Sequence, residues 1–272
     1  MPDKWGQYPY CESKPLTSRP ILTSIKTGRV FAVFDHRTQD SGNVSYGVQV
    51  GEERFFLKTA GKPDAPKPIS HDFSISLLRN AQRLWEKSRH PFLPELYQVI
   101  ESPDGPLCVY EWADGELLGN ARDRFRALPE PVIIRTLDGI HALHHQLIGL
   151  GWIAVDFYDG CLIYDFDRQA LHVMDLDHYH FGPFTNEMGR MFGSGRFMAP
   201  EEYELGTQID ERTTVFTMGR TTAVLLSDNS LDRQPFRGNE AQYEVMSRAC
   251  RENRDERHVS MAQFHTAWIN AC

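Results

Sequence analysis

The chain has 272 residues, of which 41% are hydrophobic and 24% charged, and its formal net charge is −8. These proportions are typical of a soluble globular protein with a substantial core, and the acidic balance disfavours nonspecific binding to nucleic acid or to an anionic membrane. Its five cysteines have no paired short spacings, which argues against a zinc module or a disulfide framework. Without a long apolar run or a signal-like N-terminus, we expect a cytoplasmic protein with no membrane span.

The first part of the chain predicts a small β-rich region. Residues 1–28 hold four prolines with little periodicity, so we expect an extended arm, either laid against the following sheet or partly disordered. Beyond the arm, apolar runs or alternation predict an antiparallel sheet of five strands. The expected strands are residues 29–35, 45–50, 53–59, 97–101 and 107–111. Residues 73–88 have the apolar spacing of a helix.

The second part of the chain predicts a mainly helical region. Residues 131–149 carry apolar side chains at helical spacing, which indicates a long helix. The same segment holds His141, His144 and His145, a spacing that can present a metal-binding face. We expect a polar helix surface there rather than a metal site.

Two isolated aspartates, Asp156 and Asp175, stand nineteen positions apart in the segment 151–182. Each ends a short apolar run, and two brief strands, residues 161–164 and 170–174, are expected between them with a polar turn. A hairpin of that size returns the chain so that both carboxylates can face one pocket. Alternatively, the two residues only end ordinary strands.

Two carboxylates held in this way suit phosphoryl transfer from ATP, because one can orient a hydroxyl or accept its proton while the other binds Mg²⁺. The segment resembles the catalytic hairpin of the protein kinase superfamily. In that family a His-Arg-Asp triplet is followed five residues later by asparagine, and then by an Asp-Phe-Gly triplet. Ala154-Val155-Asp156, Cys161 and Asp175-Leu176-Asp177 occupy those places here.

Six further segments resemble kinase motifs in the correct order, and the resemblance covers residues 29–271. They match, in turn, the lysine strand, the start of the fourth strand, the hinge, the end of the activation segment, the large buried helix and the late arginine segment. The matching residues are 54–58, 90–97, 109–115, 192–201, 210–219 and 253–260. Ala199-Pro200-Glu201 reproduces the family's Ala-Pro-Glu motif.

The resemblance implies an α+β, bilobal protein-kinase-like fold. An N-terminal extension (1–28) would precede a small N-lobe (29–112), which has five antiparallel strands and one helix, and a mainly helical C-lobe (113–272). ATP and Mg²⁺ or Mn²⁺ are the implied cofactors. The implied partner is a protein substrate or binding partner, with neither nucleic acid nor membrane.

The resemblance also assigns roles to individual residues. Lys58, Asp156 and Asp175 are the implied catalytic residues, acting on the phosphates, the acceptor hydroxyl and the metal respectively. Asp177, in place of a glycine, either adds a second oxygen ligand to the metal or caps the next turn. The implied nucleotide-binding residues are Lys58, Phe56, Gly47, Glu111, Ala113 and Asp175.

Several neighbours depart from the family pattern. Phe56 replaces a small alanine over the adenine, so its ring must rotate aside, stack on the base or fill the pocket. The loop before Gly47 lacks the three-glycine pattern, and Ala81 stands where the family has the glutamate that pairs with the lysine. Tyr158 replaces a lysine that neutralises the transferred phosphoryl group. Cys161 replaces a metal-binding asparagine, although neutral sulfur is a poor Mg²⁺ ligand.

Other positions suggest structural roles. Glu201 and Arg257 resemble the ion pair that ties the activation segment to the C-lobe. Thr214 replaces an aspartate that grips the catalytic loop, so that anchor is reduced to at most a hydroxyl. Ser194 matches a serine or threonine that bonds the catalytic loop, or is simply a turn residue between two glycines. His178 and His180 flank Tyr179 just after Asp177 and are further candidate metal ligands.

Three functions are compatible with the sequence. The first is an ATP-dependent phosphotransferase acting on protein serine or threonine. The second is the same chemistry on a small metabolite, which Asp177 favours. The third is a pseudokinase, a catalytically impaired protein-binding module, which the accumulated departures favour. Those departures are at Phe56, Ala81, Val155, Tyr158, Cys161 and Thr214. The first function is preferred because the sequence retains the three charged residues that define the chemistry, Lys58, Asp156 and Asp175.

Overall fold

The computed structural model describes residues 28–35, 42–64 and 69–272. Almost all of the expected N-terminal arm lies outside the described residues, as do parts of the loops before Gly42 and before Ile69. The chain divides into two compact units, which are described separately. The sheet unit comprises Met1–Trp85 and Arg89–Ala113, and the helical unit comprises Glu86–Ser88 and Asp114–Cys272.

The described residues form an α+β structure with a five-stranded antiparallel sheet and six α-helices. The expected class and sheet are therefore confirmed. Among the described helices, none has the length and hydrophobicity of a membrane span.

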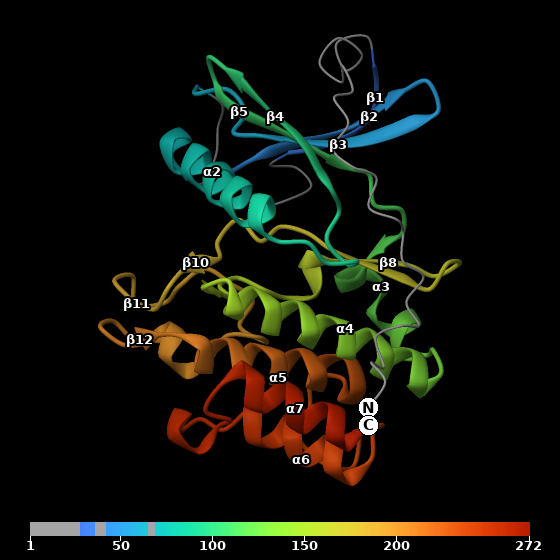
Figure 1. The fold of residues 1–272 in the computed structure, drawn as a ribbon, viewed down its shortest axis with the longest axis vertical. Coiled ribbons are helices and arrows are strands. Elements are labelled where there is room, and N and C mark those ends of the chain that lie inside the picture. The colour runs from blue at the N-terminus through green and yellow to red at the C-terminus, as the bar shows by residue number, and fades with distance from the viewer. Residues whose placement is uncertain (1–27, 36–41, 65–68) are drawn as a thin grey trace. The chain divides into compact units, whose positions relative to one another are not determined.

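The strands of the sheet unit follow the order β1-β2-β3-β5-β4 (Figure 1). They are β1 (Arg29–Phe34), β2 (Val44–Val50), β3 (Glu53–Thr59), β4 (Leu96–Ser102) and β5 (Gly105–Glu111). Each expected strand is present, with ends that differ by two residues at most. Alternate side chains of a strand point to opposite faces, so Phe55 and Leu57 of β3 enter a buried apolar cluster on one face. Phe56 and Lys58 belong to the other face.

Helix α2 (His71–Lys87) packs on one face of the sheet (Figure 1). The contact of Trp85 with Tyr110 identifies this as the face that carries Phe56. The side chains that predicted the helix are its buried stripe, namely Leu77, Leu78, Ala81, Leu84 and Trp85. The Trp85 ring stands edge-on to Tyr110 of β5 with centroids 5.4 Å apart, and Tyr110 is the cross-strand neighbour of Phe56. The Trp85 indole N–H donates to the Pro94 carbonyl at 2.9 Å. This hydrogen bond satisfies the polar tip of a buried ring.

The helical unit is built on five α-helices of the described residues. They are α3 (Leu118–Arg126), α4 (Glu130–Gly149), α5 (Glu211–Ser227), α6 (Glu240–Ala249) and α7 (Met261–Ala271). Helix α4 packs against α5 and α7, and α6 packs against the same two helices (Figure 1). Helix α5 is buried almost all round, which agrees with the expected large buried helix.

Short strands and 3-10 turns connect these helices. The strands are β6 (Glu116–Leu117), β7 (Trp152–Ile153), β8 (Leu162–Asp165), β9 (Ala170–Val173), β10 (His180–Phe181), β11 (Phe184–Thr185) and β12 (Gln208–Ile209). The 3-10 turns are Asp159–Cys161, Pro200–Tyr203 and Arg254–Glu256. β6, β8 and β9 form one sheet, β7 pairs with β10, and β11 pairs with β12.

The expected ion pair between Glu201 and Arg257 is present in the interior of the helical unit. Arg257 is fully buried and donates to both oxygens of Glu201, at 2.7 and 2.9 Å. The Thr213 hydroxyl donates to the same carboxylate at 2.9 Å. Burial alone raises the pKa of Glu201, but the guanidinium of Arg257 outweighs it and keeps this pKa below its usual range. The pair is therefore ionised and fastens the turn Pro200–Tyr203 to the segment that follows α6.

Substitution Glu201→Gln should destabilise the protein strongly, because it leaves the buried Arg257 charge uncompensated. We expect a loss of about 3–5 kcal/mol in the free energy of unfolding, measured by urea denaturation. The control is Glu240→Gln, which breaks the exposed Arg233–Glu240 pair and should cost no more than about 1 kcal/mol. Equal losses for the two variants would contradict the role of the buried pair.

Candidate functional site

The acid hairpin, residues 156–177, forms as expected. Strands β8 and β9 pair in antiparallel register from Leu162↔Val173 to Asp165↔Ala170. At the open end, the Cys161 thiol lies 3.5 Å from the Asp156 carbonyl and 3.9 Å from the Asp175 carbonyl. The Met174 amide donates to the Cys161 carbonyl at 2.8 Å. One thiol therefore bridges the backbones of both predicted catalytic aspartates.

A second strand pair, β7 with β10, holds the outer flanks of the same two chain segments. Ile153 of β7 is directly paired with His180 of β10. Asp156 comes three residues after Ile153, and Asp177 comes three residues before His180. The two acidic segments are therefore held together on both sides, by the hairpin and by this pairing.

Both predicted catalytic aspartates have left-handed backbone conformations. The φ angle is 59° at Asp156 and 60° at Asp175. Such angles are uncommon for non-glycine residues, and they concentrate at active sites and ligand-binding clamps where the surrounding structure enforces them. This conformation, shared by two acids that one thiol bridges, marks the segment as a candidate active site.

The three acids differ in accessibility. Asp175 is exposed and Asp156 is partly exposed, whereas Asp177 is only 3% exposed. His178 Nε2 lies 3.9 Å from Asp156 Oδ2. The histidine therefore lies beside the aspartate that is predicted to face the acceptor hydroxyl. Among the described residues, no three histidine, cysteine, aspartate or glutamate side chains gather closely enough to hold a metal ion by themselves. One or two carboxylates still suit Mg²⁺, which usually takes its remaining ligands from water and substrate phosphates.

The backbone before Asp156 is anchored to helix α5. The Ala154 amide donates to the Thr214 hydroxyl at 3.1 Å, and Thr214 is buried. The Thr214 hydroxyl thus anchors the backbone before Asp156, at the position where the kinase pattern has an aspartate. Ser194 acts as a turn residue, since its carbonyl accepts the Phe197 amide at 2.8 Å.

One ion pair near Asp156 has no counterpart in the sequence analysis. Arg196 donates to both oxygens of Asp159, at 2.9 and 2.8 Å, and the Asp159 side chain is only 2% exposed. The partners are 37 residues apart, with no sequence pattern that links them. Their bidentate contact fixes the segment before Ala199 to the turn that follows Asp156.

In the sheet unit, Phe56 belongs to a cluster of aromatic rings. Its centroid lies 6.2 Å from that of Phe34, 6.4 Å from Tyr110 and 6.5 Å from Trp112. Phe31 stands edge-on to Trp112 at 4.8 Å. The Phe56 ring therefore packs among other aromatic rings of the sheet unit.

Four other nucleotide-binding candidates belong to the sheet unit, namely Gly47, Lys58, Glu111 and Ala113. Gly47 is paired with Phe56 across β2 and β3, and a Cβ atom at Gly47 would lie 2.7–2.9 Å from the rings of Phe31 and Trp112. Glycine is therefore required here because the rings cover its backbone. Lys58 is buried, with 7% of its surface exposed. The Glu111 amide donates to the Glu95 carbonyl at 2.8 Å. Ala113 is the last residue of the sheet unit.

The expected polar surface at the histidines of α4 is wrong for two of the three. His141 and His144 are buried, and only His145 is exposed. The reason is that α4 is enclosed by α5, α7 and the segment after Asp175, so its polar-looking face is interior. Burial lowers the pKa of His141 well below its usual value, so its ring is neutral.

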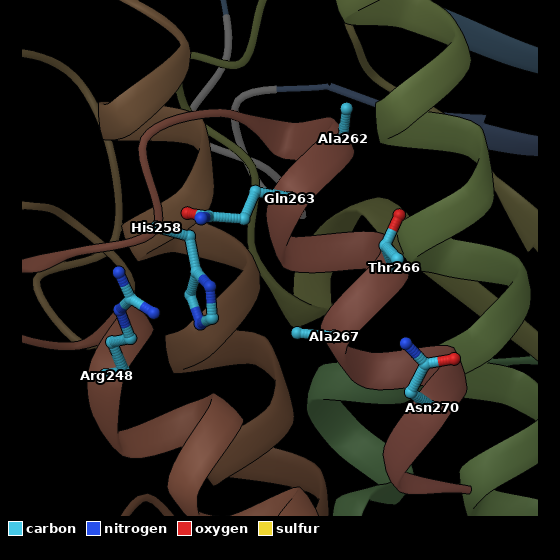
Figure 2. A pocket seen from close by; sticks show the side chains of 7 residues that line it. All are labelled: Arg248, His258, Ala262, Gln263, Thr266, Ala267 and Asn270. Carbon is cyan, nitrogen blue, oxygen red and sulfur yellow. The ribbon is translucent and has the colours of Figure 1, made fainter.

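An open groove of about 480 Å³ lies between α6 and α7 (Figure 2). Its wall includes Arg248, His258, Gln263 and Asn270. None of the predicted site residues lines this groove, so it does not belong to the acid hairpin.

The acid hairpin is therefore a candidate site with two aspartates in left-handed backbone conformations, whose backbone carbonyls lie near one thiol. No protein-family model matches the sequence, and no curated protein matches it.

Glu202 is a buried acid next to the turn that carries the Ala-Pro-Glu motif. It is 2% exposed, its carboxyl accepts the Ala199 amide at 2.7 Å, and its carbonyl accepts the Met191 amide at 2.8 Å. Burial raises the pKa of Glu202 to about 8; the Ala199 amide opposes this shift, and the charges of Glu201 and Asp156 add to it. At neutral pH the Glu202 carboxyl is therefore mostly protonated.

This proton makes stability depend on pH. The unfolded chain loses the Glu202 proton near its ordinary pKa of 4.5, whereas the folded chain keeps it up to about 8, so stability falls as pH rises through that window. Glu202→Gln removes the ionisation. The melting temperature of this variant should match wild type near pH 5 and exceed it at pH 8 by at least about 2–4 °C, the shift produced by about 1 kcal/mol.

The matched control is Glu204→Gln, because Glu204 is exposed and lies on the same turn. Its melting temperature should follow that of the wild type at both pH values. Identical melting of Glu202→Gln and wild type at pH 8 would contradict the buried, protonated carboxyl.

Proposed function

We propose that this protein is a divergent, protein-kinase-like phosphotransferase that moves the γ-phosphate of ATP to a hydroxyl of a protein serine or threonine. In this proposal the fold is bilobal and kinase-like, with the sheet unit as N-lobe and the helical unit as C-lobe. The observation that carries it is the acid hairpin, where Asp156 and Asp175 share a left-handed backbone and one bridging thiol.

Each charged residue has a role suited to its position. Asp156, partly exposed, orients the acceptor hydroxyl and takes its proton as the phosphoryl group leaves ATP. Asp175, exposed at the end of β9, holds Mg²⁺ or Mn²⁺, with Asp177 as the second carboxylate. When bound, the cation neutralises charge on the triphosphate. Lys58 of β3 binds the phosphates, the role that the resemblance assigns to the lysine of this strand.

The acceptor side also departs from an ordinary kinase. The Tyr158 ring packs over Gly160, where a Cβ atom would meet it at 2.2 Å. Tyr158 stands where the family carries a lysine, and the Arg196 charge of the same region is paired with Asp159. The transferred phosphoryl group thus has less positive charge around it, so we expect slow transfer compared with ordinary kinases.

A second candidate function is a pseudokinase that binds a protein partner without catalysis. The packing of Phe31, Phe56 and Trp112 over Gly47 favours it, because these rings occupy the strand face that would receive the adenine and cover the glycine backbone. The two functions differ in whether this cluster opens for a nucleotide.

Nucleotide and metal together should stabilise the wild-type protein. At a hundred-fold excess over Kd, binding contributes about 2.7 kcal/mol, which thermal shift detects as a rise of several degrees. Transfer of labelled γ-phosphate to a basic protein mixture or to the chain itself should accompany it. Asp175→Asn should abolish both the metal-dependent shift and the transfer.

The matched control for this experiment is Asp167→Asn, at the exposed turn of the same hairpin. It should behave as wild type. A metal-dependent shift without transfer would favour the pseudokinase, and no shift with any nucleotide would refute the phosphotransferase.

The aromatic cluster gives a separate prediction. Phe56→Ala removes the ring at the centre of the cluster and restores the small residue of the family, so nucleotide affinity should rise by about ten-fold if the ring competes with adenine. Titration calorimetry with ATP and Mn²⁺ measures this, with Phe92→Ala as a control in the same unit. Unchanged or weaker nucleotide binding in Phe56→Ala would show that the ring does not compete.

A further inference from the structure

A buried hydrogen bond joins helix α4 to the segment that follows Asp175. His144 and Tyr179 are each 1% exposed, and His144 Nε2 lies 2.7 Å from the Tyr179 hydroxyl. His144 Nδ1 lies 2.8 Å from the carbonyl of Ile140. A carbonyl oxygen only accepts, so Nδ1 carries a proton and donates to it. The tautomer with its proton on Nδ1 leaves Nε2 to accept the Tyr179 hydroxyl.

The same imidazole also contacts the other acidic segment. The Phe157 ring packs on His144 with centroids 4.5 Å apart, and Phe157 is buried. Phe157 directly follows Asp156 in the chain. The His144 side chain of α4 therefore contacts Phe157, which follows Asp156, and Tyr179, which lies in the turn that follows Asp175.

The turn that Tyr179 closes contains the second acidic position. The Tyr179 amide donates to the Leu176 carbonyl at 3.2 Å, so Asp177 lies inside the turn. If the phenol is held by His144, the turn and its carboxylate are held with it. None of these contacts uses a carboxylate, so the arrangement fixes position without occupying a cation ligand.

We propose that His144 and Tyr179 are positioning residues that set the placement of Asp156 relative to Asp175 and Asp177. The inference rests on the proposed function, because it assigns these residues to the metal-nucleotide site of the same reaction. Residues that orient ligands from behind typically change metal affinity by about 10–100-fold when removed.

Tyr179→Phe deletes only the hydroxyl and is the primary test. In hydrogen exchange on the full chain, peptides spanning residues 154–161 should exchange faster, as should those spanning 175–182, although the substitution lies in only one of the two segments. In binding experiments with Mn²⁺ and a non-hydrolysable ATP analogue, metal affinity should fall by about ten-fold, while metal-free nucleotide affinity stays unchanged.

Two further variants separate positioning from general packing. His144→Gln keeps an acceptor near the Nε2 position and should retain metal affinity close to wild type, whereas His144→Leu should lose it. Tyr243→Phe is the matched control, because it removes a hydroxyl that donates to the Leu231 carbonyl at 3.0 Å in an exposed place. It should alter neither acidic segment.

The outcomes are distinguishable. Faster exchange confined to 175–182 in Tyr179→Phe, with 154–161 unchanged, would overturn the coupling of the two acids. Metal affinity equal to wild type in Tyr179→Phe would overturn it as well. A wild-type protein that binds no metal-nucleotide at all would refute the proposed function, and the exchange experiment would still decide whether His144 and Tyr179 couple the two segments.

Discussion

The structure of the helical unit depends on keeping two aspartates in a backbone conformation that free chains avoid. Left-handed φ angles at non-glycine residues cost about 1–3 kcal/mol each and persist only where surrounding contacts enforce them. Here the enforcement comes from the β8–β9 hairpin, the β7–β10 pair and the Cys161 thiol. Strand β8 contacts α3, and β7 contacts α4 and α5. These contacts act on the backbone, while Asp175 is exposed and Asp156 is partly exposed.

The two units differ in how well they suit nucleotide chemistry. Compared with the kinase pattern that the sequence resembles, the helical unit has both acids but neutral groups at neighbouring positions, namely a thiol where the pattern has an amide and a threonine where it has an aspartate. The sheet unit keeps a buried lysine but surrounds its strand face with rings. Neutral substitutes preserve geometry at the expense of electrostatic stabilisation. This fits slow chemistry or binding alone better than rapid turnover.

Much of this could be predicted from the sequence because it depends on short-range patterns. Alternation placed β3, helical spacing placed α2 and α4, and the polar turn at residues 165–169 placed the acid hairpin. Motif order led to the Glu201–Arg257 pair, although its partners lie 56 residues apart.

The features that were missed depend on tertiary packing. The apolar spacing of α4 does not reveal that its histidine face is covered by other elements, so His141 and His144 were wrongly expected on the surface. The Asp159–Arg196 pair joins segments with no shared pattern, and the cover over Gly47 requires Phe31 and Trp112 to meet across the sheet. Strand ends moved by up to two residues because hydrogen-bonded pairing, rather than composition, ends a strand.

The most direct measurement is paramagnetic broadening of backbone amide signals by Mn²⁺ in the presence of ATP. If the acid hairpin holds the metal, the amides of Asp156, Cys161 and residues 175–177 should broaden first and together, at substoichiometric Mn²⁺. Broadening elsewhere, or equal broadening with and without ATP, would contradict a metal-nucleotide site at these aspartates.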